Sequence, residues 1–189
     1  MKWIKIEYYL MPLLAIFFLQ SCSEKNLSES RAMNQVEAYL SANPMYETAD
    51  IAYGEVKFRA KADAGLLKAY KKLDSLGYIE MAMKQERKRF LSKDSTYVYI
   101  VKFTDKSIPF VLEKGAKKAK VKTYYYELDK SIPAHIEQKG KNRAVAVMSL
   151  KKQQTDFYEF SKDKNPHATF NKRDFSLKFD KNEGWVVTK

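Results

Sequence analysis

Apolar residues recur every three or four positions in two segments of the chain, residues 31–42 and 63–76. This spacing places them on one face of an α-helix. Asn43-Pro44 ends the first segment, because the residue before a proline avoids helical geometry. Gly77 suits the left-handed conformation that commonly ends a helix and follows the second segment. The pattern therefore predicts two helices with these bounds.

After Gly77 the chain alternates between apolar and polar residues, which is typical of β-strands. Strands are predicted over 79–83, 96–103, 118–128, 143–151 and 170–179, with a last hairpin closed by Trp185-Val186-Val187. An earlier strand is predicted over 51–59, where a change of phase near Gly54 indicates a bulge. Residues 109–115 are interpreted as one helical turn or a loop.

These elements together predict an α+β protein. We expect two N-terminal helices with a small antiparallel sheet over 31–115, followed by an antiparallel β-meander over 116–189. The two parts either share one core or form separate subdomains. Residues 22–30, CSEKNLSES, are small and polar and are interpreted as a flexible tether.

The chain begins MKWIKIEYYLMPLLAIFFLQSC. Two lysines near the start precede an apolar run of 12 residues, Tyr8 to Leu19. A membrane-spanning helix needs about 20 such residues. A basic start, a short apolar core and a small residue before the cysteine are the layout of a secretory signal peptide. We therefore interpret residues 1–21 as a leader.

Leu19-Gln20-Ser21-Cys22 is similar to the lipobox of bacterial lipoprotein precursors. The resemblance implies that the Cys22 thiol carries a diacylglycerol, that the leader is cut off before it, and that the new amino terminus is acylated. Several acyl chains, palmitate among them, would form a stable membrane anchor. By the same resemblance Ser23 indicates the outer membrane, facing either the periplasm or the cell exterior. The alternatives are a cleaved signal with an incidental cysteine and a cytosolic protein with a buried N-terminal helix.

Segment 63–105 contains LLKAYKKLDSLGYIEM, then a basic stretch, then STYVYIVKFTD. This order is similar to the last helix and wing of winged-helix domains. The resemblance implies a helix that enters the DNA major groove while nearby cations contact phosphates. The candidate cations are Lys68, Lys71, Lys72, Arg87, Lys88 and Arg89. An exported lipoprotein does not meet the chromosome, so we expect no nucleic-acid partner and favour a helix packed on a hairpin.

Composition excludes several classes of protein. A hydrophobic content of 45% excludes a wholly disordered chain, and a single cysteine excludes a disulfide scaffold or a cysteine zinc site. The sequence has no Gly-rich phosphate loop, no G-x-S-x-G elbow and no H-E-x-x-H motif. His135 and His167 are interpreted as surface or packing residues. We therefore expect no catalytic residue, cofactor or metal site.

The formal net charge is +12, and lysines gather in one predicted strand. A strand has a side-chain period of two, so one face would carry Lys118, Lys120, Lys122, Tyr124 and Tyr126. Ammonium groups and stacked rings on an exposed face suit an anionic glycan or a lipid headgroup. The alternative is a solvated strand whose lysines prevent edge-to-edge aggregation.

The leading functional hypothesis is a non-catalytic, lipid-anchored lipoprotein of the bacterial cell envelope that binds a protein partner or an anionic ligand. The alternative is an envelope enzyme, or an enzyme accessory subunit, whose site is built from residues scattered along the sequence. Convergent carboxylates or a His–carboxylate pair in a pocket would favour the enzyme. A shallow basic and aromatic face would favour binding.

Overall fold

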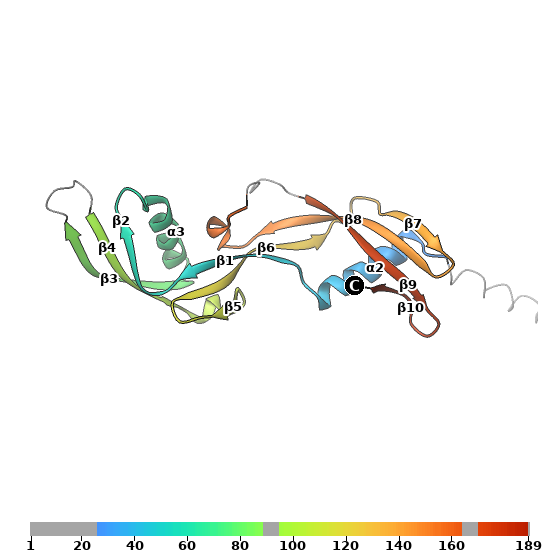
Figure 1. Cartoon of the computed structure of the whole chain (residues 1–189), viewed down its shortest axis with the longest axis horizontal. Helices are drawn as coiled ribbons and strands as arrows, with labels where there is room; N and C mark the ends of the chain where they lie inside the picture. Colours follow the sequence, from blue (N-terminus) through green and yellow to red (C-terminus); the bar gives the residue numbers. More distant parts are fainter. Residues whose placement is uncertain (1–25, 89–94, 164–169, 189) are drawn as a thin grey trace, which may run out of the picture. The chain divides into compact units, whose positions relative to one another are not determined.

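The computed structural model describes residues 26–88, 95–163 and 170–188 (Figure 1). The expected leader, Cys22, the first residues of the expected tether, Arg89 and His167 lie outside this part. The helices are α2 (Glu29–Ala42), α3 (Ala64–Ser75) and the short 3₁₀ turns η2 (Asp105–Ser107) and η3 (Tyr158–Phe160). The strands are β1 (Tyr46–Ala52), β2 (Gly54–Arg59), β3 (Ile79–Lys88), β4 (Ser95–Phe103), β5 (Val111–Lys114), β6 (Lys118–Leu128), β7 (His135–Gly140), β8 (Arg143–Gln154), β9 (Phe170–Asp180) and β10 (Gly184–Thr188).

The α+β class predicted from the sequence is wrong. Of the described residues, 54% lie in strands and 21% in helices, and the protein is mostly β. Both predicted helices form, but they do not share a small sheet. β1 instead pairs with β6 in a seven-stranded antiparallel sheet, while β2, β4 and β3 form a separate three-stranded sheet. The partners of β1 are about 70 residues away in sequence, so the pattern within each segment did not reveal the pairing.

The chain divides into two compact units that alternate along the sequence. The first unit contains the chain up to residue 42, 128–150 and 172–189, and the second contains 43–127 and 151–171. This division differs from the predicted boundary between 115 and 116. The physical reason is that β6 and β8 contribute residues to both units, so no single cut in the sequence separates them.

In the first unit, α2 packs against β10. The helix buries Ala32, Val36 and Leu40, and Trp185 on β10 is 1% exposed. The β9–β10 hairpin turns through Gly184, whose φ of +76° suits a residue without a side chain. None of the described helices is long and apolar enough to cross a membrane.

In the second unit, α3 packs on the three-stranded sheet (Figure 1). The rings of Phe58 and Tyr70 meet edge to face, with centroids 5.1 Å apart. The Tyr70 hydroxyl donates a hydrogen bond of 2.8 Å to the Ala52 carbonyl, and burial raises the pKa of this hydroxyl. Asp63 does not cap the helix with its side chain and instead accepts hydrogen bonds from Arg59, which lower its pKa.

Gly54 explains the change of phase predicted within residues 51–59. Its φ is +77°, and the chain leaves β1 and starts β2 at this point. The expected single bulged strand is therefore two strands in two different sheets. A left-handed residue turns the chain more sharply than a bulge does, and glycine adopts this conformation without steric cost.

The winged-helix resemblance rests on α3, β3 and β4. These elements form a helix followed by an antiparallel hairpin, with β4 also paired to β2. Within the described part of the second unit, α3 is the only α-helix. The winged-helix arrangement that formed part of the predicted fold class is thus replaced by one helix on a three-stranded sheet.

Candidate functional site

The predicted lysine face lies on β6, whose bounds, Lys118–Leu128, agree with the prediction. Lys118 is exposed, and Lys120 and Lys122 are half-buried. They alternate with Ala119 and Val121, which are buried. The structure therefore brings the three lysines to one face, as a period of two requires.

The face ends at Thr123. The pairing of β1 with β6 shifts register between Glu47 and Thr48, which lie opposite Tyr124 and Lys122. Thr123 and Tyr124 are consequently both buried, and Tyr124 is 1% exposed. The exposure predicted for Tyr124 is wrong, because the bulge interrupts the alternation on which it depended.

Two of the three lysines of this face, Lys120 and Lys122, have partners within the second unit. Lys120 Nζ lies 3.0 Å from Glu113 Oε2, and Asp50 stands opposite Lys120 in the β1–β6 register. Lys122 donates a hydrogen bond of 2.8 Å to the Pro109 carbonyl. These contacts fit a solvated strand whose charges are met within the chain, and binding of an anionic ligand here stays a prediction.

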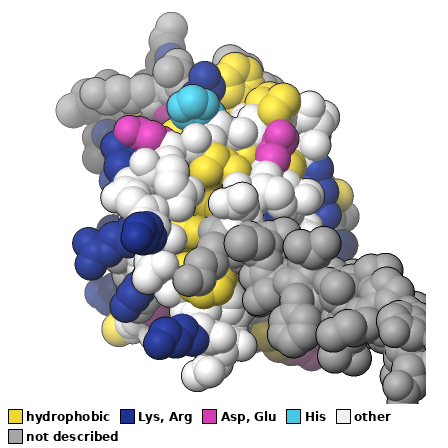
Figure 2. Space-filling view, turned by 90° about the vertical axis from the view of Figure 1, so that its right-hand side faces the viewer, with side chains coloured by type: hydrophobic (Ala, Val, Ile, Leu, Met, Phe, Trp, Pro, Cys, Tyr) yellow, Lys and Arg dark blue, Asp and Glu magenta, His cyan; other side chains and the backbone are white. Residues whose placement is uncertain are grey.

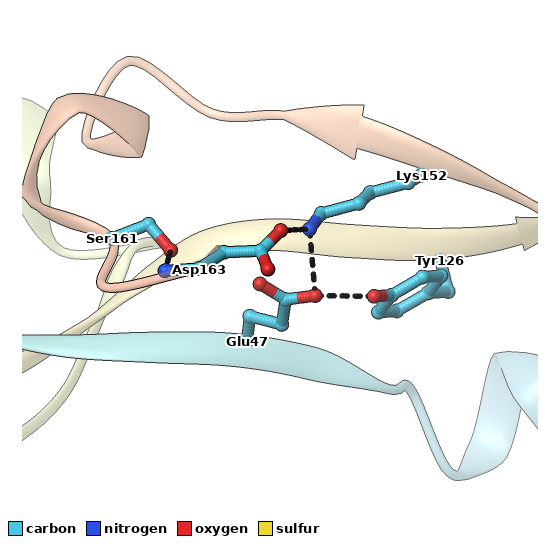
Figure 3. A network of polar contacts seen from close by, with 5 residues as sticks. All are labelled: Glu47, Tyr126, Lys152, Ser161 and Asp163. Atoms are coloured by element: carbon cyan, nitrogen blue, oxygen red, sulfur yellow. Dashed lines mark hydrogen bonds and ion pairs between the residues drawn. The ribbon is translucent and has the colours of Figure 1, made fainter. Parts of the chain in front are cut away.

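Lys152 on β8 lies at the centre of a polar cluster that the sequence did not indicate (Figure 3). Its side chain is 5% exposed. Its Nζ atom lies 2.9 Å from Glu47 Oε1, forms an ion pair with Asp163, and stands 4.0 Å from the centroid of the Tyr124 ring. The cluster joins β1, β6, β8 and the segment after η3 within the second unit.

Further contacts hold the Glu47 carboxylate and the backbone of Asp163 in place. The Tyr126 hydroxyl donates to the Glu47 carboxylate, and the Asp163 backbone N–H donates to the Ser161 hydroxyl at 3.1 Å (Figure 3). Burial and the hydrogen bond to Glu47 raise the pKa of Tyr126. Tyr126 is thus half-buried and committed to this cluster rather than to the predicted lysine face.

The electrostatics of the cluster favour a structural role for Lys152. Burial acts to lower the pKa of its ammonium, but hydrogen bonds to Asp163 and Glu47 outweigh burial and raise the pKa. A lysine that acts as a nucleophile or general base needs the opposite shift. The cation therefore holds two carboxylates together and remains protonated. Its partner Glu47 is over 100 residues away, and no local pattern marks Lys152 among the 35 basic residues of the chain.

Tyr78 makes a second tyrosine–carboxylate contact in this unit. Its hydroxyl donates to Asp156 Oδ2 at 2.5 Å, and its ring is buried. The hydrogen bond to Asp156, together with burial, raises the pKa of Tyr78 to about 12. The contact joins the turn after α3 to the segment between β8 and η3.

Replacing Tyr78 with Phe should lower the free energy of unfolding by about 2 kcal/mol at neutral pH, because a hydrogen bond to a charged group is lost. Above pH 10 the unfolded tyrosine ionises while the native one keeps its proton up to about pH 12, so the wild-type protein loses stability over this window. The difference in the free energy of unfolding between the wild-type and Tyr78→Phe proteins should therefore narrow as the pH rises above 10. Urea denaturation of both proteins at pH 8 and pH 11 measures this difference. A constant or widening difference would contradict the hydrogen bond between Tyr78 and Asp156 as the cause.

A cleft of about 480 Å³ in the first unit is lined by residues of the neighbouring strands β7, β8, β9 and β10. We call it the basic cleft. Eight described residues line it: Lys139, Arg143, Ala144, Val145, Ser176, Leu177, Lys178 and Thr188. Three of them are cations and two carry hydroxyl groups, whereas none is acidic. The three cations are exposed, and Lys139 also forms an ion pair with Glu137 outside the lining.

A second cleft, of about 840 Å³, lies at the β7–β8 turn. Asn26 and Leu27, just before α2, line it together with Gln138, Gly140, Lys141 and Asn142. We call it the N-terminal cleft. In the view of Figure 2, Lys and Arg side chains lie mainly along the left side, with others at the top and the right edge.

The sequence did not single out the cations of the basic cleft. Arg143 and Lys178 are separated by more than 30 residues, and only the pairing of β8 with β9 brings their strands together. The predicted lysine face, by contrast, was visible because its members follow one another in one strand. Among the described residues, no group of three His, Cys, Asp or Glu side chains could hold a metal ion.

Comparisons with protein-family models, curated proteins and solved structures found no match to this chain. Two features bear directly on function: the segment that ends at Cys22 and the basic cleft.

Proposed function

We propose that this protein is a lipid-anchored, non-catalytic lipoprotein of the bacterial cell envelope that binds an anionic ligand in the basic cleft. The observation that carries the binding proposal is the lining of that cleft, where Lys139, Arg143 and Lys178 converge without an acidic neighbour in the lining. The lipobox-like segment ending at Cys22 supports the anchor and the envelope location.

The chemistry of the lining suits a phosphate or a carboxylate. The Arg143 guanidinium can donate two parallel hydrogen bonds to such a group, and a lysine ammonium adds a point charge. Ser176 and Thr188 supply hydroxyl groups beside them, while Val145, which is half-buried, contributes apolar surface. Because the cations are exposed, each contact is weak and depends on salt, so the ligand needs several anionic groups or a high local concentration.

Binding to heparin, a soluble polyanion, tests the proposal. Arg143→Gln should weaken binding about twofold to fivefold at low ionic strength, since an exposed ion pair contributes up to about 1 kcal/mol. Lys68→Gln, an exposed cation on α3 in the other unit, is the matched control and should have a smaller effect. The affinity should fall steeply as salt rises. Equal effects of the two changes, or binding that ignores salt, would count against the basic cleft.

A further inference from the structure

We propose that the anionic ligand of the basic cleft is the phosphate of lipid headgroups in the membrane that carries the anchor. This inference rests on the proposed function, because it takes acylation of Cys22 as its starting point. It adds the identity of the partner and assigns the side of the first unit that contacts the membrane.

The short chain between Cys22 and Asn26 limits how far the first unit can lie from the anchor. Asn26 lies four residues after Cys22. An extended chain spans at most about 3.6 Å per residue, so Asn26 is within about 14 Å of an acylated cysteine. Asn26 and Leu27 line the N-terminal cleft together with Lys141 and Asn142 of the β7–β8 turn. An anchor at Cys22 therefore keeps this turn close to the lipid surface.

Two cations, Lys141 and Arg143, lie at the β7–β8 turn itself. Gly140 and Arg143 are partners in the β7–β8 register, so Arg143 stands at the base of the turn, with Lys141 between them in sequence. Arg143 also lines the basic cleft with Lys178. The same turn thus borders both the N-terminal cleft and the basic cleft.

The attraction between these cations and anionic lipid headgroups is modest for each side chain and adds up over several of them. Lysine and arginine side chains near an anionic lipid surface each contribute about 1 kcal/mol, or about fivefold in affinity, and the attraction falls off within a Debye length of about 8–10 Å. The anchor keeps Asn26 within about 14 Å of Cys22, and Asn26 lines a cleft with Lys141 of the turn that Arg143 closes. Tethering also raises the local headgroup concentration, so weak contacts suffice to orient the first unit.

The predicted lysine face on β6 is a weaker candidate for this contact. Lys120 pairs with Glu113 and stands opposite Asp50, and Lys122 donates to a backbone carbonyl. Its cations are therefore partly neutralised within the second unit. The cations of the β7–β8 turn and the basic cleft are far from Cys22 in sequence, but the fold places this turn beside Asn26.

The test uses the mature chain with Cys22→Ser, which removes the anchor and leaves headgroup binding as the only route to a membrane. Sedimentation with vesicles of phosphatidylcholine alone, or mixed with phosphatidylglycerol, measures binding. The test variant combines Lys141→Gln, Arg143→Gln and Lys178→Gln and leaves Lys139 in place because it pairs with Glu137. The matched control combines Lys68→Gln, Lys71→Gln and Lys102→Gln, which are exposed in the second unit and change the net charge equally.

The mature Cys22→Ser protein with no further change should bind only the vesicles that contain phosphatidylglycerol. The test variant should bind them on the order of a hundredfold more weakly, and the control only a few-fold more weakly. Equal binding to both kinds of vesicle, or equal losses in the two variants, would overturn the inference. Emission of Trp185, the single tryptophan of the mature chain, verifies that each variant is folded.

Heparin separates this inference from the proposed function. Binding to heparin without binding to phosphatidylglycerol vesicles would overturn the headgroup as the ligand and leave an anion-binding cleft. Binding to neither would overturn both proposals. A second measurement places a fluorophore at Asn142→Cys, the only thiol once Cys22 is Ser. Its emission should rise with phosphatidylglycerol vesicles, whereas a fluorophore at Lys71→Cys should not respond, and the reverse pattern would overturn the assigned side.

Discussion

Replacing Cys22 with Ala is expected to move the protein from the membrane fraction to the soluble exported fraction, or to leave the leader uncut. In bacterial lipoproteins the cysteine is the site of lipid attachment, and this is the only cysteine of the chain. Each buried methylene group contributes about 0.8 kcal/mol, so one acyl chain holds a protein marginally and two or more hold it stably. Loss of the cysteine removes all of this binding at once.

Labelling with radioactive palmitate, followed by fractionation, measures the effect. The unchanged protein should take up label and remain with membranes at high salt, whereas the Cys22→Ala protein should take up none. Ser23→Ala is a matched control, because it alters the neighbouring residue and leaves the thiol in place. An unlabelled and soluble wild-type protein would show that the lipobox resemblance is incidental.

The Cys22→Ala protein also tests whether lipid headgroups hold the protein at a membrane without the acyl anchor. If the basic cleft binds headgroups, part of the unlipidated protein should stay with membranes at low ionic strength and leave them as salt rises. The acyl anchor does not depend on salt in this way. A salt titration of the Cys22→Ala protein therefore distinguishes the anchor from the electrostatic contact of the first unit.

Local structure was predictable where a few neighbouring residues decide it. Gly77 ends α3 with a φ of +77°, and the alternation between residues 118 and 128 marked β6 with its observed bounds. In both places the deciding forces act within a few positions: the steric freedom of glycine and the period of a strand. For the same reason both predicted helices formed close to their expected ends.

Sheet membership and the functional residues were not predictable in this way. Gly54 separates two strands of different sheets, and the partner of β1 is β6, which no residue of either segment specifies alone. The bulge at Thr123 buries Tyr124 and depends on the register with β1. Arg143 and Lys178 likewise meet only because β8 pairs with β9. Long-range pairing therefore decided the fold class and the location of the basic cleft.

Replacing Lys152 with Met is expected to lower the free energy of unfolding by about 3–5 kcal/mol. The side chain is 5% exposed and stands between Glu47 and Asp163. Removing the cation takes away the ammonium that lies between these two partly buried carboxylates and leaves their charges close to each other. Urea denaturation followed by circular dichroism measures the loss. Lys102→Met, an exposed lysine on β4, is the control and should change stability by less than about 0.5 kcal/mol.

The cause of that loss can be tested by removing the stranded charges as well. Adding Glu47→Gln and Asp163→Asn to Lys152→Met should recover more than half of the lost stability, because a neutral cluster of similar volume has little charge to desolvate. Tyr126 can still donate its hydroxyl hydrogen to the amide oxygen that Glu47→Gln introduces. If the three changes together were as damaging as the sum of their single effects, the three charges would not be coupled, and the ion pairs would not be what holds β1, β8 and the segment after η3 together.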